Sequence, residues 1–248
     1  MIQEKPNWGK KLGLLTPATN LTVEDELWRM RVEEVTIATA RIVIDQVEWK
    51  TEQDLERFVL GVAERLPETT TRVMQAQPNG LLLGISSSNL WGGIKTNTEM
   101  KARARRDTGL ELTTPVDAMI EGLDVFKARR IGVVTPYPEL ADAQVVSFFK
   151  EIGVEVVAQK GLRCKSARDI AEVPPAVLRD ALCQVRVKGV EALVTLGTDL
   201  KISRVAAEAE RWLGLPVLAV NATTWWCALR QQGVTARLLG WGTLLEDH

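Results

Sequence analysis

Short apolar runs that end abruptly in small polar residues recur along this chain and limit the folds that it can adopt. The clearest run is Leu81–Ile85, which is followed by Ser86, Ser87, Ser88 and Asn89. A continuous apolar run of this length is typical of a strand buried in a parallel sheet. Its polar end would lie at the carboxyl edge, where open α/β sheets bind ligands. Serines near a helix start suit a carboxylate or phosphate, but they would equally form a turn that caps the next helix.

The rest of the chain alternates between strand and helix patterns. Further strands are expected at residues 12–16, 35–44, 110–114, 130–135, 154–159, 192–196 and 216–220. Helices are expected at residues 24–31, 51–66, 95–106, 117–127, 141–152, 175–187 and 203–213, with a final helix after residues 221–224. Repeated strand–helix units of this kind predict parallel sheets with helices on both faces.

The order of these elements repeats within the chain. Residues 12–20 resemble residues 130–139, about 120 positions later, and residues 81–89 have their counterpart at residues 194–199. A period of this length indicates a duplicated domain rather than a solenoid. The carboxyl ends of parallel strands are therefore expected near four residues, Thr16, Gly84, Thr135 and Gly197.

We predict an α/β fold with two similar halves, each built on a parallel sheet, around a central cleft. The first half would comprise residues 1–115 and 217–248, and the second half residues 116–216. The C-terminal segment would pack back onto the first half. Because ligand pockets are common at domain interfaces, the strand-end loops of both halves are expected to meet at one site.

Composition excludes several classes of function. The net charge of −1 gives no reason to expect a nucleic-acid partner or an anionic membrane surface. No apolar run approaches the roughly 20 residues needed to span a bilayer, and the N-terminal residues do not resemble a signal peptide. The expected partner is a small molecule, and the sequence leaves a homo-oligomer open.

Cysteine and histidine usage limits the chemistry further. Three widely spaced cysteines, Cys164, Cys183 and Cys227, match neither a disulfide framework nor a zinc site, so a reducing, cytoplasmic setting is expected. The single histidine is the last residue, His248, which argues against a Ser-His-Asp hydrolase or a histidine-ligated metal. No glycine-rich nucleotide motif follows a strand. We therefore expect no metal and no cofactor.

Three segments together resemble a known family. Residues 17–24 read PATNLTVE and resemble the PSSNTTME-like signature of maleate cis–trans isomerases, and residues 214–225, GLPVLAVNATTW, resemble their GxPVxSSNQATxW segment. The stretch from residues 86–87 through 108–110 to 134–137 is similar to arylmalonate decarboxylases. The chain thus resembles this branch of the Asp/Glu racemase superfamily. The resemblance implies two flavodoxin-like halves around a cleft, in agreement with the pattern of elements.

The sequence departs from this family at both of its cysteine positions. Ile85 stands where the first cysteine is expected, and Gly197 stands where the second is expected, in a loop whose isomerase counterpart reads SCTNLR. A thiolate acts as nucleophile or proton donor because its pKa lies close to neutral, and neither isoleucine nor glycine has such a proton. This argues against cysteine-based racemisation, isomerisation and decarboxylation. Cys227 is a candidate substitute, although a buried cysteine is usually a small apolar residue.

The resemblance to the decarboxylases implies a hole for a carboxylate. Ser86 and Ser87 match the hydroxyl residues of their dioxyanion hole, and Tyr137, the only tyrosine, matches its phenol donor. Hydroxyl and N–H groups that converge on one point can hold an anion without a fixed cation.

The resemblance to the isomerases implies further substrate-binding residues. Asn20 and Asn221 match the asparagines that contact the carboxylate, and Thr198 follows the second cysteine position. Arg41 is either an additional cation at the site or a solvated residue at a strand edge. Asp199 is either a proton carrier, if burial raises its pKa, or a helix-capping residue.

The function expected from these features is that of a lyase- or isomerase-type enzyme acting on a small carboxylate by decarboxylation, elimination or isomerisation. It would use an oxyanion hole without the cysteine pair, with Tyr137, Asp199 and Ser86 as the reacting groups. Tryptophans beside the polar loops, Trp91 and Trp225 among them, favour a substrate with an apolar portion. Two alternatives stay open: a non-catalytic carboxylate-binding or regulatory protein descended from such enzymes, and a hydratase or hydrolase in which Asp199 activates water.

Overall fold

Two four-stranded parallel sheets form the framework of the molecule, which is described by a computed structural model covering residues 9–45, 49–87 and 92–248. The first sheet has the order β2-β1-β3-β4 and the second the order β6-β5-β7-β8. The strands are β1 Lys10–Pro17, β2 Val35–Ile42, β3 Gly80–Leu83, β4 Leu112–Thr113, β5 Arg130–Thr135, β6 Glu155–Gly161, β7 Ala192–Thr195 and β8 Val217–Ala219. The same order in both sheets confirms the predicted duplication.

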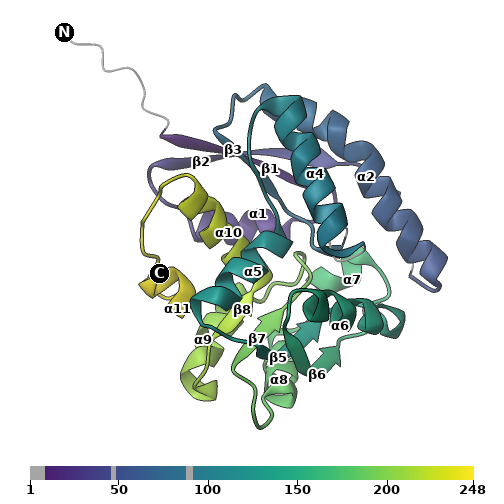
Figure 1. Cartoon of the computed structure of the whole chain (residues 1–248), viewed down its shortest axis with the longest axis vertical. Helices are drawn as coiled ribbons and strands as arrows, with labels where there is room; N and C mark the ends of the chain where they lie inside the picture. The colour runs from purple at the N-terminus through teal and green to yellow at the C-terminus, as the bar shows by residue number, and fades with distance from the viewer. Residues whose placement is uncertain (1–8, 46–48, 88–91) are drawn as a thin grey trace.

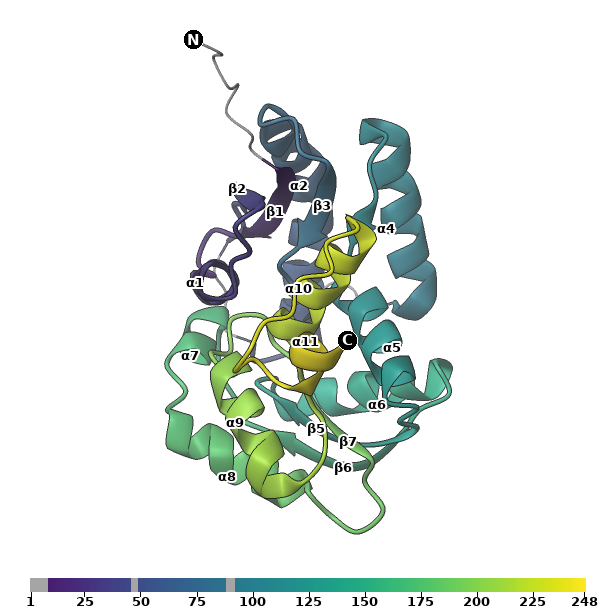
Figure 2. The same cartoon turned by 90° about the vertical axis from the view of Figure 1, so that its left-hand side faces the viewer.

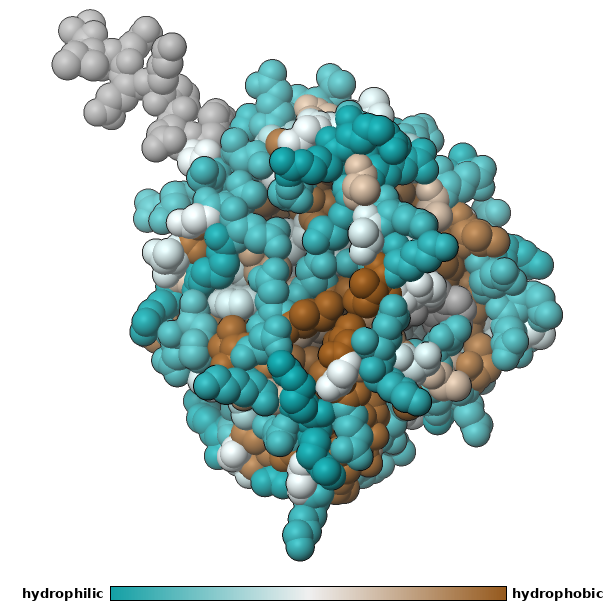
Figure 3. Space-filling view, in the orientation of Figure 1, coloured by the Kyte–Doolittle hydropathy of each residue, from teal (hydrophilic) through white to brown (hydrophobic). Residues whose placement is uncertain are grey.

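Helices cover both sheets and join the two halves (Figure 1). They are α1 Thr22–Arg29, α2 Glu52–Met74, α4 Gly93–Thr108, α5 Pro115–Val125, α6 Asp142–Glu151, α7 Ala167–Ala171, α8 Pro175–Val185, α9 Ser203–Leu213, α10 Val220–Gln231 and α11 Thr243–Asp247, with a short 3-10 helix η1 Glu139–Ala141. No helix in these residues is long and apolar enough to cross a membrane. Hydrophilic residues cover most of the face in Figure 3, and hydrophobic residues gather near its centre.

The strands that lead to the cleft are buried along their length. Every residue of β3 and of β7 is buried, which explains why both read as continuous apolar runs rather than as alternating patterns. Both strands are inner strands of their sheets: β3 pairs with β1 and β4, and β7 pairs with β5 and β8. Their carboxyl ends therefore deliver polar loops from the interior of each half, and Thr16, Gly84, Thr135 and Gly197 lie at or just beyond strand ends as predicted.

The C-terminal part of the chain reconnects the halves. β8 pairs with β7, so Val217–Ala219 belongs to the second sheet, although the sequence placed the return to the first half at residue 217. The return takes place at α10, which contacts α1, β3 and β4 of the first half as well as α5 and α9. In Figure 2, α10 lies between the two halves. This helix holds together the two sheets whose loops meet at the site.

Among the other differences from the sequence expectation, α2 is longer than predicted, and the short helices α7 and α11 were not predicted. Helix α2 continues through Pro67 to Met74, whereas the pattern ended at residue 66. The hydroxyls of Thr69, Thr70 and Thr71, just beyond the proline, donate to the carbonyls four residues earlier, at 2.8–3.1 Å. The short helix α7 falls in a stretch that the sequence placed in a loop. Its cap is Ser166, whose hydroxyl accepts from the Asp169 N–H.

Candidate functional site

Loops from both halves meet at a pair of buried hydroxyls. Ser86, which follows β3, has its Oγ 2.9 Å from the phenol oxygen of Tyr137, which follows β5. The backbone N–H of Gly197, which follows β7, donates to the same Ser86 Oγ at 3.2 Å. Ser86 and Tyr137 are each 2% exposed. Three strand-end loops from two sheets therefore place hydrogen-bonding groups at one buried point.

The phenol of Tyr137 stays protonated near neutral pH and can donate a hydrogen bond. Burial raises its pKa to about 12, and the hydrogen bond with Ser86 offsets part of that rise. A neutral O–H in a water-poor site can stabilise a carboxylate or an enolate oxygen without a counter-charge. Ser87 lies beside these groups and is also buried.

A small cavity opens onto these groups. It has a volume of about 30 Å³ and is lined by Pro17, Thr19, Asn20, Trp49, Phe58, Ile85, Ser86, Ser87, Tyr137, Ala167, Ile170, Gly197, Thr198 and Asp199. This is room for little more than a water molecule, so a substrate has to displace part of the rim. The lining side chains that the structure describes include no lysine, arginine or histidine. Trp49 and Phe58 form an edge-to-face pair, with centroids 5.6 Å apart, on the apolar side.

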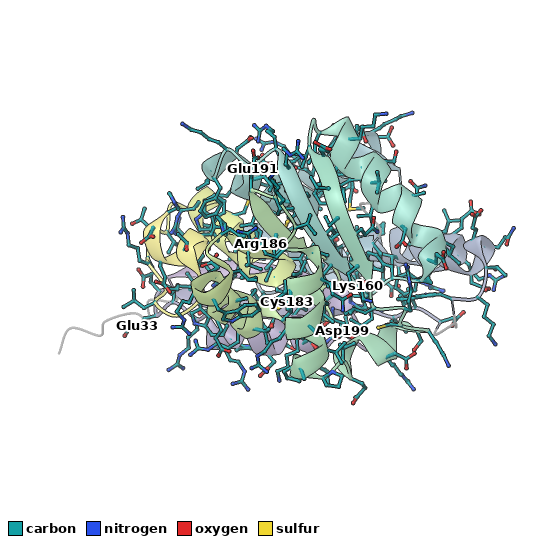
Figure 4. The ribbon with its side chains drawn as sticks, turned by 90° about the horizontal axis from the view of Figure 1, so that it is seen from below. Glu33, Lys160, Cys183, Arg186, Glu191 and Asp199 are labelled. Carbon is teal, nitrogen blue, oxygen red and sulfur yellow. The ribbon has the colours of Figure 1, made fainter. Side chains whose placement is uncertain are left out.

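Asp199 carries the one carboxylate among these lining residues. It is 5% exposed, and neither carboxylate oxygen has a hydrogen-bond partner within the described structure. Burial raises its pKa to about 6, and the hydroxyl and N–H of Thr22 at the start of α1 offset part of the rise. These Thr22 groups face the carboxylate without reaching the geometry of a formed hydrogen bond. Figure 4 shows Asp199 and Glu191, which flank β7, at opposite ends of the second sheet.

The two asparagines expected at the site differ in position. Asn20 lines the cavity, and its amide donates to Thr198 Oγ1 at 3.0 Å. Thr198 Oγ1 in turn donates to the carbonyl of Gly84 at 3.0 Å. Asn221 lies behind the cavity, where its amide donates to Glu26 at 2.7 Å and to the Thr198 carbonyl at 2.9 Å. Asn221 therefore holds the loop that carries the site rather than lining the cavity.

Arg41 is likewise placed behind the cavity. One guanidinium nitrogen donates to the backbone carbonyl of Asn20 at 2.8 Å, and the other forms an ion pair with Glu24. Glu24 also accepts from the hydroxyl of Thr39 at 2.6 Å. Arg41 thus orients the loop of Asn20 and adds no cation to the lining.

Sequence reasoning missed Glu26. It is 3% exposed and accepts from the Ser203 N–H at 2.9 Å, from Ser203 Oγ at 2.6 Å and from Asn221. Burial raises its pKa, and the hydrogen bonds from Ser203 and Asn221 oppose that rise. Glu26 joins α1 of the first half to the starts of α9 and α10. The available signal was its place on the apolar face of α1, between Val23 and Leu27.

The backbone at the second cysteine position is shaped for glycine. Gly197 has φ +90°, in the left-handed region that side chains with a Cβ rarely adopt. A Cβ built on it would lie 2.7 Å from Cδ of Pro136 and would also collide with Cγ of that ring. At the first position, Ile85 is buried and contributes an apolar wall. The backbone and its neighbours at position 197 therefore leave no room for a cysteine side chain without a local shift.

None of the three cysteines is among the described residues that line the cavity. The Sγ of Cys227 lies 3.3 Å from a carboxylate oxygen of Glu121, and burial together with that acid raises the pKa of the thiol. Burial also raises the pKa of Cys164 to about 11, and Cys183 is exposed on α8 (Figure 4). The residues that the structure describes include no cluster of three or more His, Cys, Asp or Glu side chains suited to a metal ion.

The tryptophans divide in a way that the sequence did not predict. Trp225 is fully buried in α10, and its indole N–H donates to the Met30 carbonyl at 2.9 Å. Trp91, Ser88 and Asn89 lie outside the described residues. Trp49 supplies the indole at the cavity instead, and its N–H has no partner in the described structure.

Comparison with known proteins agrees with the resemblance noted in the sequence. The arylmalonate decarboxylase family model matches residues 12–245. The chain is 25% identical to the maleate isomerase of Pseudomonas putida over 247 residues, which are 95% of this chain and 97% of that one. It is 29% identical to the arylmalonate decarboxylase of Bordetella bronchiseptica over 174 residues, 67% and 70% of the two chains.

Solved structures show the same fold. A mutant of the Nocardia farcinica maleate cis–trans isomerase with a covalently bound succinylcysteine intermediate superposes with a TM-score of 0.87 at 20% identity, over 96% of this chain and 99% of that one. A double mutant of arylmalonate decarboxylase in its liganded form gives a TM-score of 0.84 at 21% identity, over 96% and 100%.

Proposed function

Because the chain belongs to the arylmalonate decarboxylase family, we propose that it is a lyase- or isomerase-type enzyme that acts on a small carboxylate without a cysteine pair. The relatives named above are isomerases and decarboxylases, which supports this class of reaction. One observation carries the proposal to this chain. A buried, unpaired carboxylate, Asp199, shares a cavity of about 30 Å³ with the hydroxyls of Ser86 and Tyr137.

The binding part of the mechanism uses the hydroxyl pair. The substrate carboxylate accepts hydrogen bonds from Tyr137 and Ser86, with Ser87, Asn20 and Thr198 around it. When the carbon next to the carboxylate loses a proton or a carbon dioxide molecule, negative charge spreads onto the carboxylate oxygens. Fixed donors in a buried site stabilise that charge more than they stabilise the substrate. Arg41 and Asn221 contribute by positioning the loops of Asn20 and Thr198.

The proton-carrying part uses Asp199. With a pKa of about 6, its carboxylate is mostly ionised near neutral pH and still close to protonation. It can therefore take a proton from the substrate carbon and return it to the same carbon or to a neighbouring one. After loss of carbon dioxide, protonated Asp199 supplies the proton that replaces the lost group. Acid–base groups whose pKa lies near the working pH are the most efficient in such steps.

Solvent deuterium exchange tests the proposal whichever product is formed. The protein is incubated in D2O with phenylmalonate, maleate, mandelate and phenylglycine, and the C–H and C=C signals are followed by NMR. The proposal predicts exchange or conversion of at least one compound, loss of it in Asp199→Asn, and its retention when all three cysteines are replaced by alanine. Turnover that depends on a cysteine would contradict the assignment to Asp199.

One observation favours the second candidate, a non-catalytic carboxylate-binding protein. The described lining contains no thiol, and both cysteine positions are filled by residues without an ionisable group. Saturable binding of a carboxylate with no exchange and no conversion would support this candidate. A hydratase or hydrolase would instead incorporate ¹⁸O from labelled water, in a reaction that requires Asp199.

Three cysteines without a disulfide partner support a reducing, cytoplasmic site of action.

A further inference from the structure

The described lining of the cavity has one pair of hydroxyls in mutual contact that can hold a carboxylate, and its further unpartnered donors, the Thr19 hydroxyl and the Trp49 indole N–H, are single and uncharged. Ser86 and Tyr137 form a hydroxyl pair, and no cationic side chain occurs in that lining. The amide of Asn20 is engaged on both sides, since its Oδ1 accepts from the Val23 N–H at 3.1 Å and its Nδ2 donates to Thr198. The Asn221 amide nitrogen donates to Glu26 and to the backbone carbonyl of Thr198, so it is engaged as well.

Asp199 adds an acceptor where a diacid would need a donor. Both of its oxygens are buried without a formed hydrogen bond in the described structure, and only the hydroxyl and N–H of Thr22 oppose the effect of burial on its pKa. Leaving a buried charged group without a full set of hydrogen bonds is costly. A second substrate carboxylate in this cavity would stand beside Asp199 with no cation between them. Like charges in one buried site disfavour the ionised forms, so one of the two acids would have to take up a proton.

The other walls of the cavity are apolar. Trp49 and Phe58 pack edge to face, and Ile85 and Ile170 complete the surface. Such walls suit the hydrocarbon portion of a ligand, and the Trp49 indole N–H and the Thr19 hydroxyl beside them carry no charge that could balance a second carboxylate.

We infer that the substrate carries a single carboxylate and, in place of a second one, a hydrogen-bond donor, either a hydroxyl or an ammonium group, that pairs with Asp199. This inference rests on the proposed function and narrows its substrate class. The carboxylate occupies the Ser86–Tyr137 pair, the donor satisfies the free oxygens of Asp199, and the hydrocarbon portion lies against Trp49 and Phe58. The preferred ligands would thus differ from the diacid named in the isomerase relatives.

Two matched series test this by calorimetric titration of the whole protein at pH 7.5. Phenylmalonate, mandelate, phenylglycine and phenylacetate differ only in the group beside the carboxylate, which is a carboxylate, a hydroxyl, an ammonium or a hydrogen. Malonate, glycolate, glycine and acetate repeat the comparison without the ring. The hydroxy or the amino acid of a series should bind at least about tenfold more tightly than its diacid and its donor-free acid, as expected for a hydrogen bond to a charged group. Tighter binding of the hydroxy acid would identify the donor as a hydroxyl, and tighter binding of the amino acid would identify it as an ammonium group.

The Asp199→Asn variant is the decisive comparison. It keeps the size of the side chain and removes the charge, so the preference over the diacid should fall by at least about tenfold. Asp25→Asn is the matched control, because Asp25 pairs with Arg29 and Lys201 away from the cavity and should leave the order unchanged. Three results would each overturn the inference. The diacid could bind wild type as tightly as its hydroxy and amino counterparts, the order of affinities could be the same in Asp199→Asn as in wild type, or none of the eight compounds could bind.

Failure of the inference can be separated from failure of the proposed function. The predicted order of binding without deuterium exchange or conversion would leave the inference standing and remove the enzymatic proposal. Turnover that depends on Asp199 but occurs only with phenylmalonate or maleate would support the enzymatic proposal and overturn the inference about the substrate.

Discussion

The hydroxyl oxygen of Ser86 lies 2.9 Å from the phenol oxygen of Tyr137, although the two residues come from loops of different sheets. This contact brings the carboxyl end of β3 against the carboxyl end of β5. It also gives the site its two strongest candidates for anion binding, because each hydroxyl can turn its proton toward a ligand.

Replacing Tyr137 by phenylalanine removes one O–H and leaves the ring packing in place. We expect the tightest-binding carboxylate of the two series to lose about 1.5–3 kcal/mol of binding free energy, the range for hydrogen bonds to charged groups. Calorimetric titration measures the loss, and melting curves show whether the fold is intact. Ser86→Ala separates the two roles considered for the serine: a turn or cap role alone lowers stability by about 1 kcal/mol and leaves affinity unchanged.

Asp199→Asn should stabilise the unliganded protein above pH 7. The pKa of Asp199 is raised to about 6 in the folded protein from about 3.8, so the folded state binds the proton more tightly than the unfolded state does. The contribution of Asp199 to the unfolding free energy is therefore fully present below pH 4 and is lost as the pH rises through 6. The shift corresponds to about 3 kcal/mol, an order-of-magnitude figure, so the variant should gain up to that amount at pH 7.5.

Denaturant unfolding of both proteins between pH 4 and 8 measures this gain. Glu26 also has a raised pKa, which makes the wild-type curve alone ambiguous. The difference between wild type and Asp199→Asn isolates Asp199, because Glu26 is common to both. A difference that does not change with pH would show that Asp199 is not held in a desolvated state.

Much of the fold follows from patterns that are local in sequence. Several features can be predicted without tertiary information. They are the apolar runs of β3 and β7, the capping box that Thr51 forms with Asp54, and the strand that ends at Thr135. The duplicated order of these elements predicted two sheets of the same topology. A strand was expected at residues 216–220, but its place in the second sheet was not, because tertiary contacts decide which strand it pairs with.

The site was predictable only in part. Ser86, Tyr137 and Asp199 lie on strand-end loops that the pattern sends to one edge, and they share the cavity. The position of Asn221 behind the cavity depends on Glu26, which in sequence looks like a surface acid on a short helix. Which partner an amide chooses is decided by three-dimensional contacts, and no local pattern records it.

Glu26→Ala should lower the unfolding free energy by about 1–3 kcal/mol for each buried donor that it leaves without an acceptor. The N–H and hydroxyl of Ser203 and the amide of Asn221 would be left without their acceptor. The neighbouring Asp25→Ala is the control, since a half-exposed ion pair contributes roughly 0–1 kcal/mol. Urea unfolding measures both. Equal effects at the two positions would contradict a role for Glu26 in joining the halves.

Restoring the second cysteine should fail for a steric reason. In Gly197→Cys the backbone must hold φ near +90° with a Cβ present, and that Cβ meets the ring of Pro136. We expect a loss of at least about 1–3 kcal/mol of stability, the cost of a strained backbone conformation, and no gain of cysteine-dependent turnover. Gly197→Ala should lose nearly as much, because the collision is made by Cβ and not by the sulfur.

Two further variants divide that loss into its causes. Gly214 has φ +70°, and a Cβ added there would have no atom within 4 Å, so Gly214→Ala measures the cost of the left-handed conformation alone, about 1 kcal/mol. The excess in Gly197→Ala then measures the contact with Pro136. In a Pro136→Ala background that excess should disappear, because the ring atoms that collide are gone. An excess that persists in this double-mutant cycle would show that a group other than Pro136 keeps a side chain out of position 197.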